Sequence, residues 1–314
     1  MRKGLLLAIA GLFVVFTVPL GAATLIPVAP VSGSVETDVY GINDDNILVG
    51  TYFTEDSAEH GFFGTSDGSY TTFDVGDAGT QGRAINNIGT ITGFANANGR
   101  VHCNFKEFER DADGSVKMLS HDHHALKGIV QGINDKGFYV GEDCQSDGSI
   151  QGYEGKAGKY KSQITLPFDA VWVGPRGLNR NGDIVGFYFD SEGVAHGFAI
   201  QQGVATSVDY PDGSVLDTYF EGINDKGMIA GVWDDADGNN HGFAFDSATD
   251  TFTEIDVPDA TFVQATGVNR AGLISVLSDV GSFIYCPLAR RKCPGGGGAV
   301  VTNRNHRQAI HVAP

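Results

Sequence analysis

The chain has 314 residues, a formal net charge of -17 and 44 glycines, and most of its aromatic residues are phenylalanine (20). So acidic a surface repels nucleic acid and anionic lipid, which excludes a protein that binds either of them by charge. Abundant glycine and phenylalanine favour many short strands joined by tight turns over a helical protein. A closed all-β array of this length can form a single domain.

The first 23 residues have the features of a signal peptide. Arg2 and Lys3 form a basic region, residues 5–18 are apolar, and residues 21–23 are small. The apolar run is too short for a comfortable membrane span. We therefore predict a signal peptide over residues 1–23 and a secreted protein, extracellular or periplasmic, with no stable membrane span after cleavage. An uncleaved anchor is the alternative.

Export makes disulfides possible for the four cysteines. Cys286 and Cys293 are close in the sequence, so they are candidates for a clip at the C-terminal end. Cys103 and Cys144 would then pair with each other or stay free. Four cysteines allow more than one connectivity, and spacing alone does not choose among them.

A short motif built on asparagine recurs six times and predicts a repeat protein. It reads Gly-Ile-Asn or a close variant, followed by a turn. The anchor asparagines are spaced by 43, 48, 45, 45 and 45 residues, and they are Asn43, Asn86, Asn134, Asn179, Asn224 and Asn269. A His-Gly-Phe motif or an altered version follows, at His60, His102, Gln151, His196 and His241.

Each unit predicts four short antiparallel strands. Apolar residues before the asparagine form the first strand, and Asn-Asp-Lys-Gly forms a hairpin turn in which Asn and Gly supply positive φ. An Ile-Val-Gly-Phe-Tyr segment forms the second strand, His-Gly-Phe opens the third, and a Thr-x-Ile-Asp segment forms the fourth. Four strands in about 45 residues is the size of a propeller blade.

The two ends of the array favour a closed ring over an open one. The sixth unit, residues 268–288, stops after its third strand, and residues 24–28 resemble the missing fourth strand. We predict an all-β protein: a six-bladed β-propeller of four-stranded antiparallel blades over residues 24–293, in which the N-terminal strand completes the last blade. We predict that residues 294–314 form a flexible C-terminal tail, and we expect a monomer.

These motifs in their order resemble the HAF-type extracellular repeat of bacterial secreted proteins. The resemblance covers essentially all of residues 24–288. It departs at His102, where the following glycine is lost, and at Gln151, which replaces the histidine. The resemblance implies export and repetition, and it transfers no catalytic residue.

Residues that the fold repeats are interpreted as scaffold. The repeated histidines (His60, His102, His196 and His241) are expected to make hydrogen bonds between strands or blades, and the repeated asparagines are expected to form turns. Function is expected where the repeats differ, because sites are added to a scaffold rather than built by it.

The strand that ends in each anchor is expected to be innermost, with alternate residues facing the central channel. Three positions before the anchors lie Tyr40, Arg83, Gln131, Arg176, Glu221 and Thr266. Five positions before lie Asp38, Gln81, Ile129, Gly174, Tyr219 and Gln264. The predicted ligand-binding residues, two arginines and a glutamate to clamp a carboxylate or a sugar and Tyr219 to stack on it, are Tyr40, Arg83, Gln131, Arg176, Tyr219 and Glu221. The alternative is a solvated channel with no ligand.

A histidine-rich loop is a second candidate. His121, Asp122, His123 and His124 are weak candidates for zinc, copper or nickel ligands, although an exposed loop is the preferred interpretation. Residues 235–239 and 111–114 resemble fragments of calcium loops, and ordinary Asp-Gly turns are preferred there. No cofactor is predicted, with calcium or a transition metal as the alternative.

Three functions follow from these residues. The first is a secreted binding or scaffold module for an extracellular glycan, peptide or surface partner, acting through the channel face. The second is a hydrolase or lyase of an anionic or polyhydroxylated substrate at the channel mouth, with His121, His123 or His124 as base and Arg83 or Arg176 to stabilise charge. The third is a purely structural surface protein. The first is preferred because the sequence has no nucleophile elbow, phosphate loop or dinucleotide fingerprint.

Overall fold

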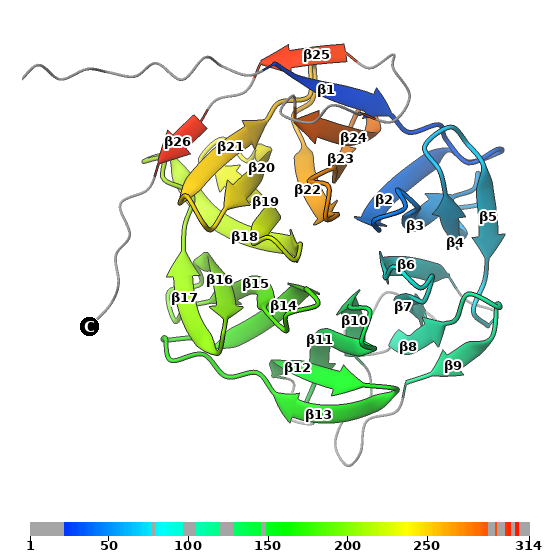
Figure 1. Cartoon of the computed structure of the whole chain (residues 1–314), viewed down its shortest axis with the longest axis horizontal. Helices are drawn as coiled ribbons and strands as arrows, with labels where there is room; N and C mark the ends of the chain where they lie inside the picture. The colour runs from blue at the N-terminus through cyan, green and yellow to red at the C-terminus, as the bar shows by residue number, and fades with distance from the viewer. Residues whose placement is uncertain are drawn as a thin grey trace, which may run out of the picture.

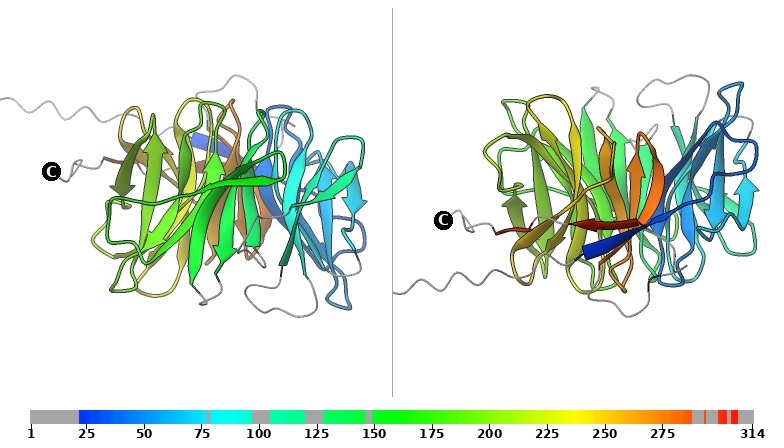
Figure 2. Two further views of the ribbon diagram at one scale, coloured as in Figure 1. Left: turned by 90° about the horizontal axis from the view of Figure 1, so that it is seen from below. Right: turned by 90° about the horizontal axis from the view of Figure 1, so that it is seen from above.

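The computed structural model describes residues 22–76, 79–96, 105–119, 128–145, 149–287, 293, 299–302 and 305–307. They form six antiparallel sheets arranged around a central axis (Figure 1), and the side views show the sheets standing next to one another around that axis (Figure 2). The predicted six-bladed β-propeller is confirmed. In this part of the chain there is no helix, and therefore none long and apolar enough to cross a membrane.

Blades 1 to 4 each contain four strands in chain order from the channel outward, and blades 5 and 6 each have a fifth strand at the outer edge. Blade 1 holds β2 (Glu36–Ile42), β3 (Leu48–Phe53), β4 (Glu59–Gly64) and β5 (Tyr70–Phe73). Blade 2 holds β6 (Thr80–Ile85), β7 (Ile91–Asn96), β8 (Phe105–Arg110) and β9 (Val116–Met118). Blade 3 holds β10 (Gly128–Ile133), β11 (Phe138–Cys144), β12 (Ile150–Lys156) and β13 (Lys159–Gln163).

The second half of the ring repeats this order. Blade 4 holds β14 (Trp172–Leu178), β15 (Ile184–Phe189), β16 (Ala195–Gln201) and β17 (Val204–Val208). Blade 5 holds β18 (Val215–Ile223), β19 (Met228–Asp235), β20 (Asn240–Asp246), β21 (Thr251–Ile255) and β26 (Asn305–Arg307). Blade 6 holds β22 (Val263–Val268), β23 (Ile274–Ser278), β24 (Gly281–Pro287), β1 (Ala22–Pro27) and β25 (Ala299–Thr302).

The anchor asparagine organises the turn between the first two strands of each blade. In blade 3, Asn134 Oδ1 accepts the backbone N–H of Lys136 at 3.0 Å and that of Phe138 at 3.1 Å. The expectation that the anchor itself has positive φ is wrong. Positive φ falls three residues later, on glycine in five units and on Asn46 (φ 63°) in the first. Glycine adopts this conformation without steric cost.

The same asparagines join the blades into a closed ring. Each buried Nδ2 donates to the backbone carbonyl of the next anchor, at distances between 2.9 and 3.2 Å. The last of these bonds runs from Asn269 back to Asn43, at 3.1 Å. The anchors are therefore inter-blade links as well as the turn formers that were predicted.

The strand register corrects the placement of one motif. In the other blades His60, Gln151, His196 and His241 begin the motif of the third strand. In blade 2 the residue at that register position is Lys106, opposite Ala95, and the buried phenylalanine of the motif is Phe108. The prediction that the motif of the second unit begins at His102 is therefore wrong, because the long preceding loop shifts it by four residues. His102 itself and Cys103 lie outside the described residues.

Ring closure uses both ends of the chain. β1 pairs with β24, with Thr24 opposite Cys286, so the N-terminal strand completes the last blade as predicted. β25 then pairs with the free edge of β1, and β26 pairs with β21 of blade 5. The flexible tail predicted over residues 294–314 is therefore corrected at β25 and β26. The outer edges of blades 5 and 6 offer unpaired backbone groups, and these two strands bind there.

The predicted clip at the C-terminal end is a disulfide. Cys286 and Cys293 are bonded, with their Cα atoms 5.9 Å apart. This bond ties the end of β24 to the chain that leads towards β25. Cys144 is also disulfide-bonded.

Asn224→Ala is expected to lower the free energy of unfolding by about 3 kcal/mol, because it leaves a buried carbonyl and two N–H groups without their partner. Those groups are Asn269 O and the N–H groups of Lys226 and Met228. Urea unfolding measures the change. Asn181→Ala is the matched control, since Asn181 makes an exposed bond to Asp225 O at 3.2 Å. Equal effects of the two substitutions would contradict a special role for the anchors.

A chain that ends at Cys293 lacks β25 and β26, and it is expected to lose about 2 kcal/mol of stability because β1 becomes an edge strand. Amide hydrogen exchange should accelerate in residues 22–27. The internal control is β5, an edge strand that does not pair with the C-terminal segment. Unchanged protection of β1 would show that β25 does not support the closing strand.

Candidate functional site

Six side chains from the innermost strands surround the channel. They lie three positions before the anchors and enclose a cavity of about 20 Å³, and they are Tyr40, Arg83, Gln131, Arg176, Glu221 and Thr266. Five of the six residues predicted to bind a ligand are thus brought together. A cavity of this size holds roughly one water molecule.

A β-bulge produces this convergence in every blade. In blade 1 Val39 is opposite Gly50 and Gly41 is opposite Val49, so Tyr40 has no partner in the register. The same skip occurs at the corresponding residue of the other blades. A bulge re-aims a side chain and breaks the alternation of the strand.

The position of Tyr219 differs from the prediction. Alternation predicted that residues five before the anchor share the channel face with those three before it. Tyr219 is absent from the residues that line the channel cavity, and its ring instead packs edge-on against Phe187 with centroids 4.9 Å apart. It is therefore part of the packing between blades 4 and 5.

The channel charges are paired with neighbouring protein groups. Arg83 Nε donates to Gln131 Oε1 at 2.9 Å, and its guanidinium lies 4.0 Å from the centroid of the Tyr40 ring. Arg176 Nη1 donates to Glu142 Oε1, and its Nε lies 3.8 Å from Glu221 Oε2. Burial raises the pKa of Glu221, and the neighbouring Arg176 and Arg83 oppose that rise.

Glu142 is a channel partner that the sequence reasoning missed. It is buried on β11 and also accepts the indole N–H of Trp172 at 3.2 Å. Its position lies eight residues after the anchor, where the other units carry Thr, Phe, Phe, Val and Leu. An acid at one otherwise uncharged strand position was the available signal.

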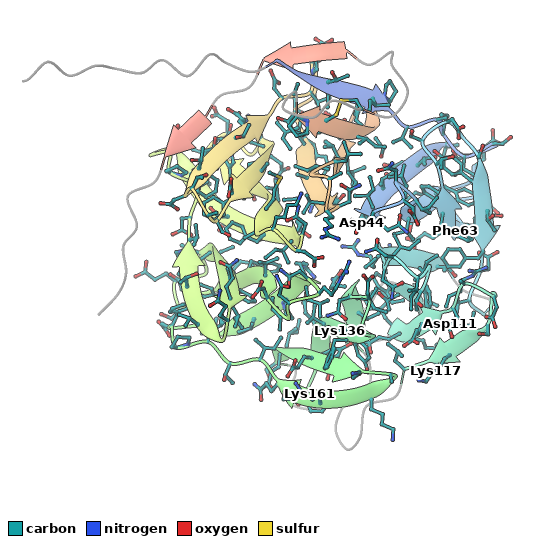
Figure 3. The ribbon with its side chains drawn as sticks, viewed as in Figure 1. Asp44, Phe63, Asp111, Lys117, Lys136 and Lys161 are labelled. Carbon is teal, nitrogen blue, oxygen red and sulfur yellow. A yellow bond between two sulfur atoms is a disulfide. The ribbon has the colours of Figure 1, made fainter. Side chains whose placement is uncertain are left out.

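On the side of the anchor turns, Arg180 reaches across the channel mouth. Its Nη2 lies 3.1 Å from Asp135, 3.4 Å from Asp225 and 3.9 Å from Asp44. Figure 3 shows Asp44 beside the channel. One guanidinium thus neutralises part of a ring of three carboxylates, and the cavity there has about 90 Å³.

The described histidines of the repeat are held by acids, as a scaffold role predicts. His60 Nδ1 lies 2.8 Å from Asp74, and His196 Nδ1 lies 3.0 Å from Asp209. Each ring also stacks on an aromatic side chain of the second strand, Tyr52 and Tyr188 respectively. These contacts lie within one blade and join its strands.

The histidine-rich loop cannot be placed against the channel. His121, Asp122, His123 and His124 lie outside the described residues, so the proposed base and metal ligands have no assigned position. Within the described ranges no group of three or more His, Cys, Asp or Glu side chains is arranged to hold a metal ion. The Asp235 segment is an Asp-Gly turn in which Asp235 Oδ1 accepts the N–H of Asp237 and of Asn239, each at 2.9 Å.

A larger cavity, the blade 5–6 pocket, lies between blades 5 and 6. It has a volume of about 320 Å³, against about 100 Å³ for the widest cavity along the channel. The pocket is lined by Asn239, Asn240, His241, Glu254, Ile255, Asp256, Ala260, Thr261 and Val263. His241 Nε2 lies 3.0 Å from Asp235, its Nδ1 lies 3.5 Å from Glu254, and its ring stacks on Trp233. This volume falls within the usual range for small-molecule sites.

Known structures share the fold at low sequence identity. A gluconolactonase of Xanthomonas campestris is 14% identical, with 85% of this chain and 91% of that chain covered and a TM-score of 0.53. A fucose-specific lectin of Aleuria aurantia is 12% identical, with 87% and 97% covered and a TM-score of 0.51. A second structure of that lectin, described as a six-bladed β-propeller, is 11% identical, with 87% and 97% covered and a TM-score of 0.50. No protein family model and no curated protein sequence matches the chain.

Asp38 is a buried acid next to the channel. Burial raises its pKa to about 6, Glu36 adds to the rise, and the hydrogen bond from Tyr40 opposes it. Because the folded pKa is higher than the ordinary value, the folded protein holds this proton more tightly than the unfolded chain does. Asp38 therefore lowers stability as the pH rises from about 4 to 6.

Asp38→Asn is expected to raise the free energy of unfolding by about 1 kcal/mol at pH 7.5 and to leave it unchanged at pH 3, where the carboxyl is protonated in both states. Urea unfolding across this pH range is the measurement. Asp45→Asn, at an exposed position of the neighbouring turn, is the control and should show no such window. A variant less stable than the parent at pH 7.5 would contradict the assigned desolvation of Asp38.

Proposed function

We propose that the protein is an exported binding module that recognises an extracellular glycan, and that the blade 5–6 pocket is its ligand site. The observation that carries the proposal is the contrast between the channel and the pocket. The channel residues pair with one another, and the cavities along the channel have volumes of about 20, 90 and 100 Å³. The blade 5–6 pocket has about 320 Å³ and polar walls. The blade 5–6 pocket therefore has both the volume for a ligand and polar side chains that can bind it.

The related folds support both binding and catalysis in principle. One neighbour is titled a fucose-specific lectin and another a gluconolactonase, and both share only the fold with this chain. Catalysis would require a base or nucleophile beside an open substrate space. The two arginines proposed to stabilise charge, Arg83 and Arg176, are instead bound to Gln131 and Glu142. Binding is therefore the function that we favour over the hydrolase or lyase alternative.

Export and kinship with the HAF-type repeat proteins belong to the same proposal. The basic and apolar start of the chain and the disulfides fit an oxidising compartment. An acidic surface there suits a soluble module that meets neutral or cationic partners. A scaffold that presents one pocket does not require a second chain, so we propose a monomer.

Ala260→Phe is expected to abolish glycan binding, because the new ring fills the pocket. Ala260 packs at the edge of the neighbouring core and donates its backbone N–H to Val257 O. A glycan array probed with the purified mature protein is the measurement. Gln131→Ala, which alters the channel instead, should retain the parent's hits. Loss of binding with Gln131→Ala but not with Ala260→Phe would move the site to the channel. An array without hits would contradict a glycan-binding function.

A further inference from the structure

The repeat itself shows what is unusual about the blade 5–6 pocket. The residue after the partner of the motif glycine is Asp74 in blade 1, Asp209 in blade 4 and Asp256 in blade 5. In blades 1 and 4 this aspartate binds the histidine of its own blade, at 2.8 and 3.0 Å. Blade 5 keeps both residue types but not their contact.

In blade 5 it is Glu254, rather than Asp256, that lies next to the Nδ1 atom of the histidine. Glu254 lies two residues before Asp256, where blades 1 and 4 carry Thr72 and Ser207, and its Oε1 is 3.5 Å from His241 Nδ1. Asp256 is exposed on the pocket wall, and within the described part of the chain it makes no hydrogen bond or ion pair. Glu254 thus contacts the histidine of blade 5 and leaves Asp256 without the contact that Asp74 and Asp209 make in blades 1 and 4.

The other polar side chains of the pocket donate hydrogen bonds to acids that do not line it. Asn239 Nδ2 donates to Asp235 at 3.0 Å, Asn240 Nδ2 donates to Asp234, and Thr261 Oγ1 donates to Asp279 at 2.8 Å. Their amide and hydroxyl oxygens keep lone pairs that can accept. Together with the two carboxylates of the wall, the lining is rich in acceptors.

Among the described residues no lysine or arginine lines this pocket, and the whole chain has a net charge of -17. An anionic ligand would meet the two carboxylates Glu254 and Asp256 there, so the electrostatics of the described lining disfavour it. An ammonium group offers three N–H donors and no acceptor, which matches an acceptor-rich wall. Sugar hydroxyls supply further donors, and the apolar Ile255 and Val263 can cover the carbon skeleton of a sugar ring.

We infer that the blade 5–6 pocket binds an amine-bearing saccharide, with Asp256 as the acceptor of its ammonium group. The inference rests on the proposed function, and it adds the chemical class of the ligand and the residue that selects it.

The experiment compares each amino sugar with its N-acetylated form, because acetylation removes the charge and keeps the ring. Titration calorimetry with glucosamine, galactosamine, N-acetylglucosamine and N-acetylgalactosamine is run at low salt. At least one free amine should bind the parent about tenfold more tightly than its acetylated form, since a charge-assisted hydrogen bond is at stake.

Asp256→Asn should remove this preference without changing thermal stability, because Asp256 has no partner in the described part of the fold. Asp209→Asn is the matched control: it makes the same substitution at the corresponding position of blade 4, where the aspartate binds His196, and it should keep the preference.

The outcomes separate the inference from the function on which it rests. Equal binding of amine and acetylated forms, both abolished by Ala260→Phe, would overturn the amine and leave the pocket as a saccharide site. A preference for the amine that persists in Asp256→Asn would overturn the role of Asp256. Absence of binding by all four sugars would overturn the inference even if the glycan array gives other hits.

Discussion

The closed circle of asparagine amides is the constraint on which the rest of the structure depends. An amide is the side chain that can donate to a neighbouring carbonyl while it accepts two backbone N–H groups of its own turn. Asn134 does both at once, towards Asn179 and towards its own hairpin. Aspartate would lack the donor and alanine would lack both groups. These hydrogen bonds therefore fix the positions of the innermost strands whichever side chains line the channel.

Much of the fold follows from patterns that survive in the sequence, whereas the channel depends on a local irregularity. Residue spacing, turn composition and the incomplete sixth unit predicted the blades and the closing strand correctly. No sequence pattern reveals the bulges in the innermost strands, because a strand with one extra residue, such as Tyr40 or Arg83, still reads as an ordinary alternating strand. The strands β25 and β26 were missed because a glycine-rich lead-in resembles a linker.

The contrast between channel and pocket shows how a repeat protein acquires a distinctive site. In the channel the six blades contribute five different residue types, yet Arg83, Arg176 and Glu221 interact with neighbouring side chains and stabilise the ring. In the blade 5–6 pocket the difference is small, one acid at Glu254 where blades 1 and 4 have the hydroxyl residues Thr72 and Ser207. Because of that single change, the histidine of blade 5 contacts Glu254 and not Asp256. The pocket could not be found from composition, because it depends on the side-chain contacts of blade 5, in which Asp256 does not contact His241.

The position of β1 between β24 and β25 has a consequence for the order of events in folding. β1 pairs with β24 and β25, which are translated after the four main strands of every other blade. Contacts this distant in the chain form slowly, because a long loop must close before they form. During synthesis the last blade remains incomplete until these strands emerge, and the ring stays open at one seam. Completion of the blade must then await the synthesis of β24 and β25.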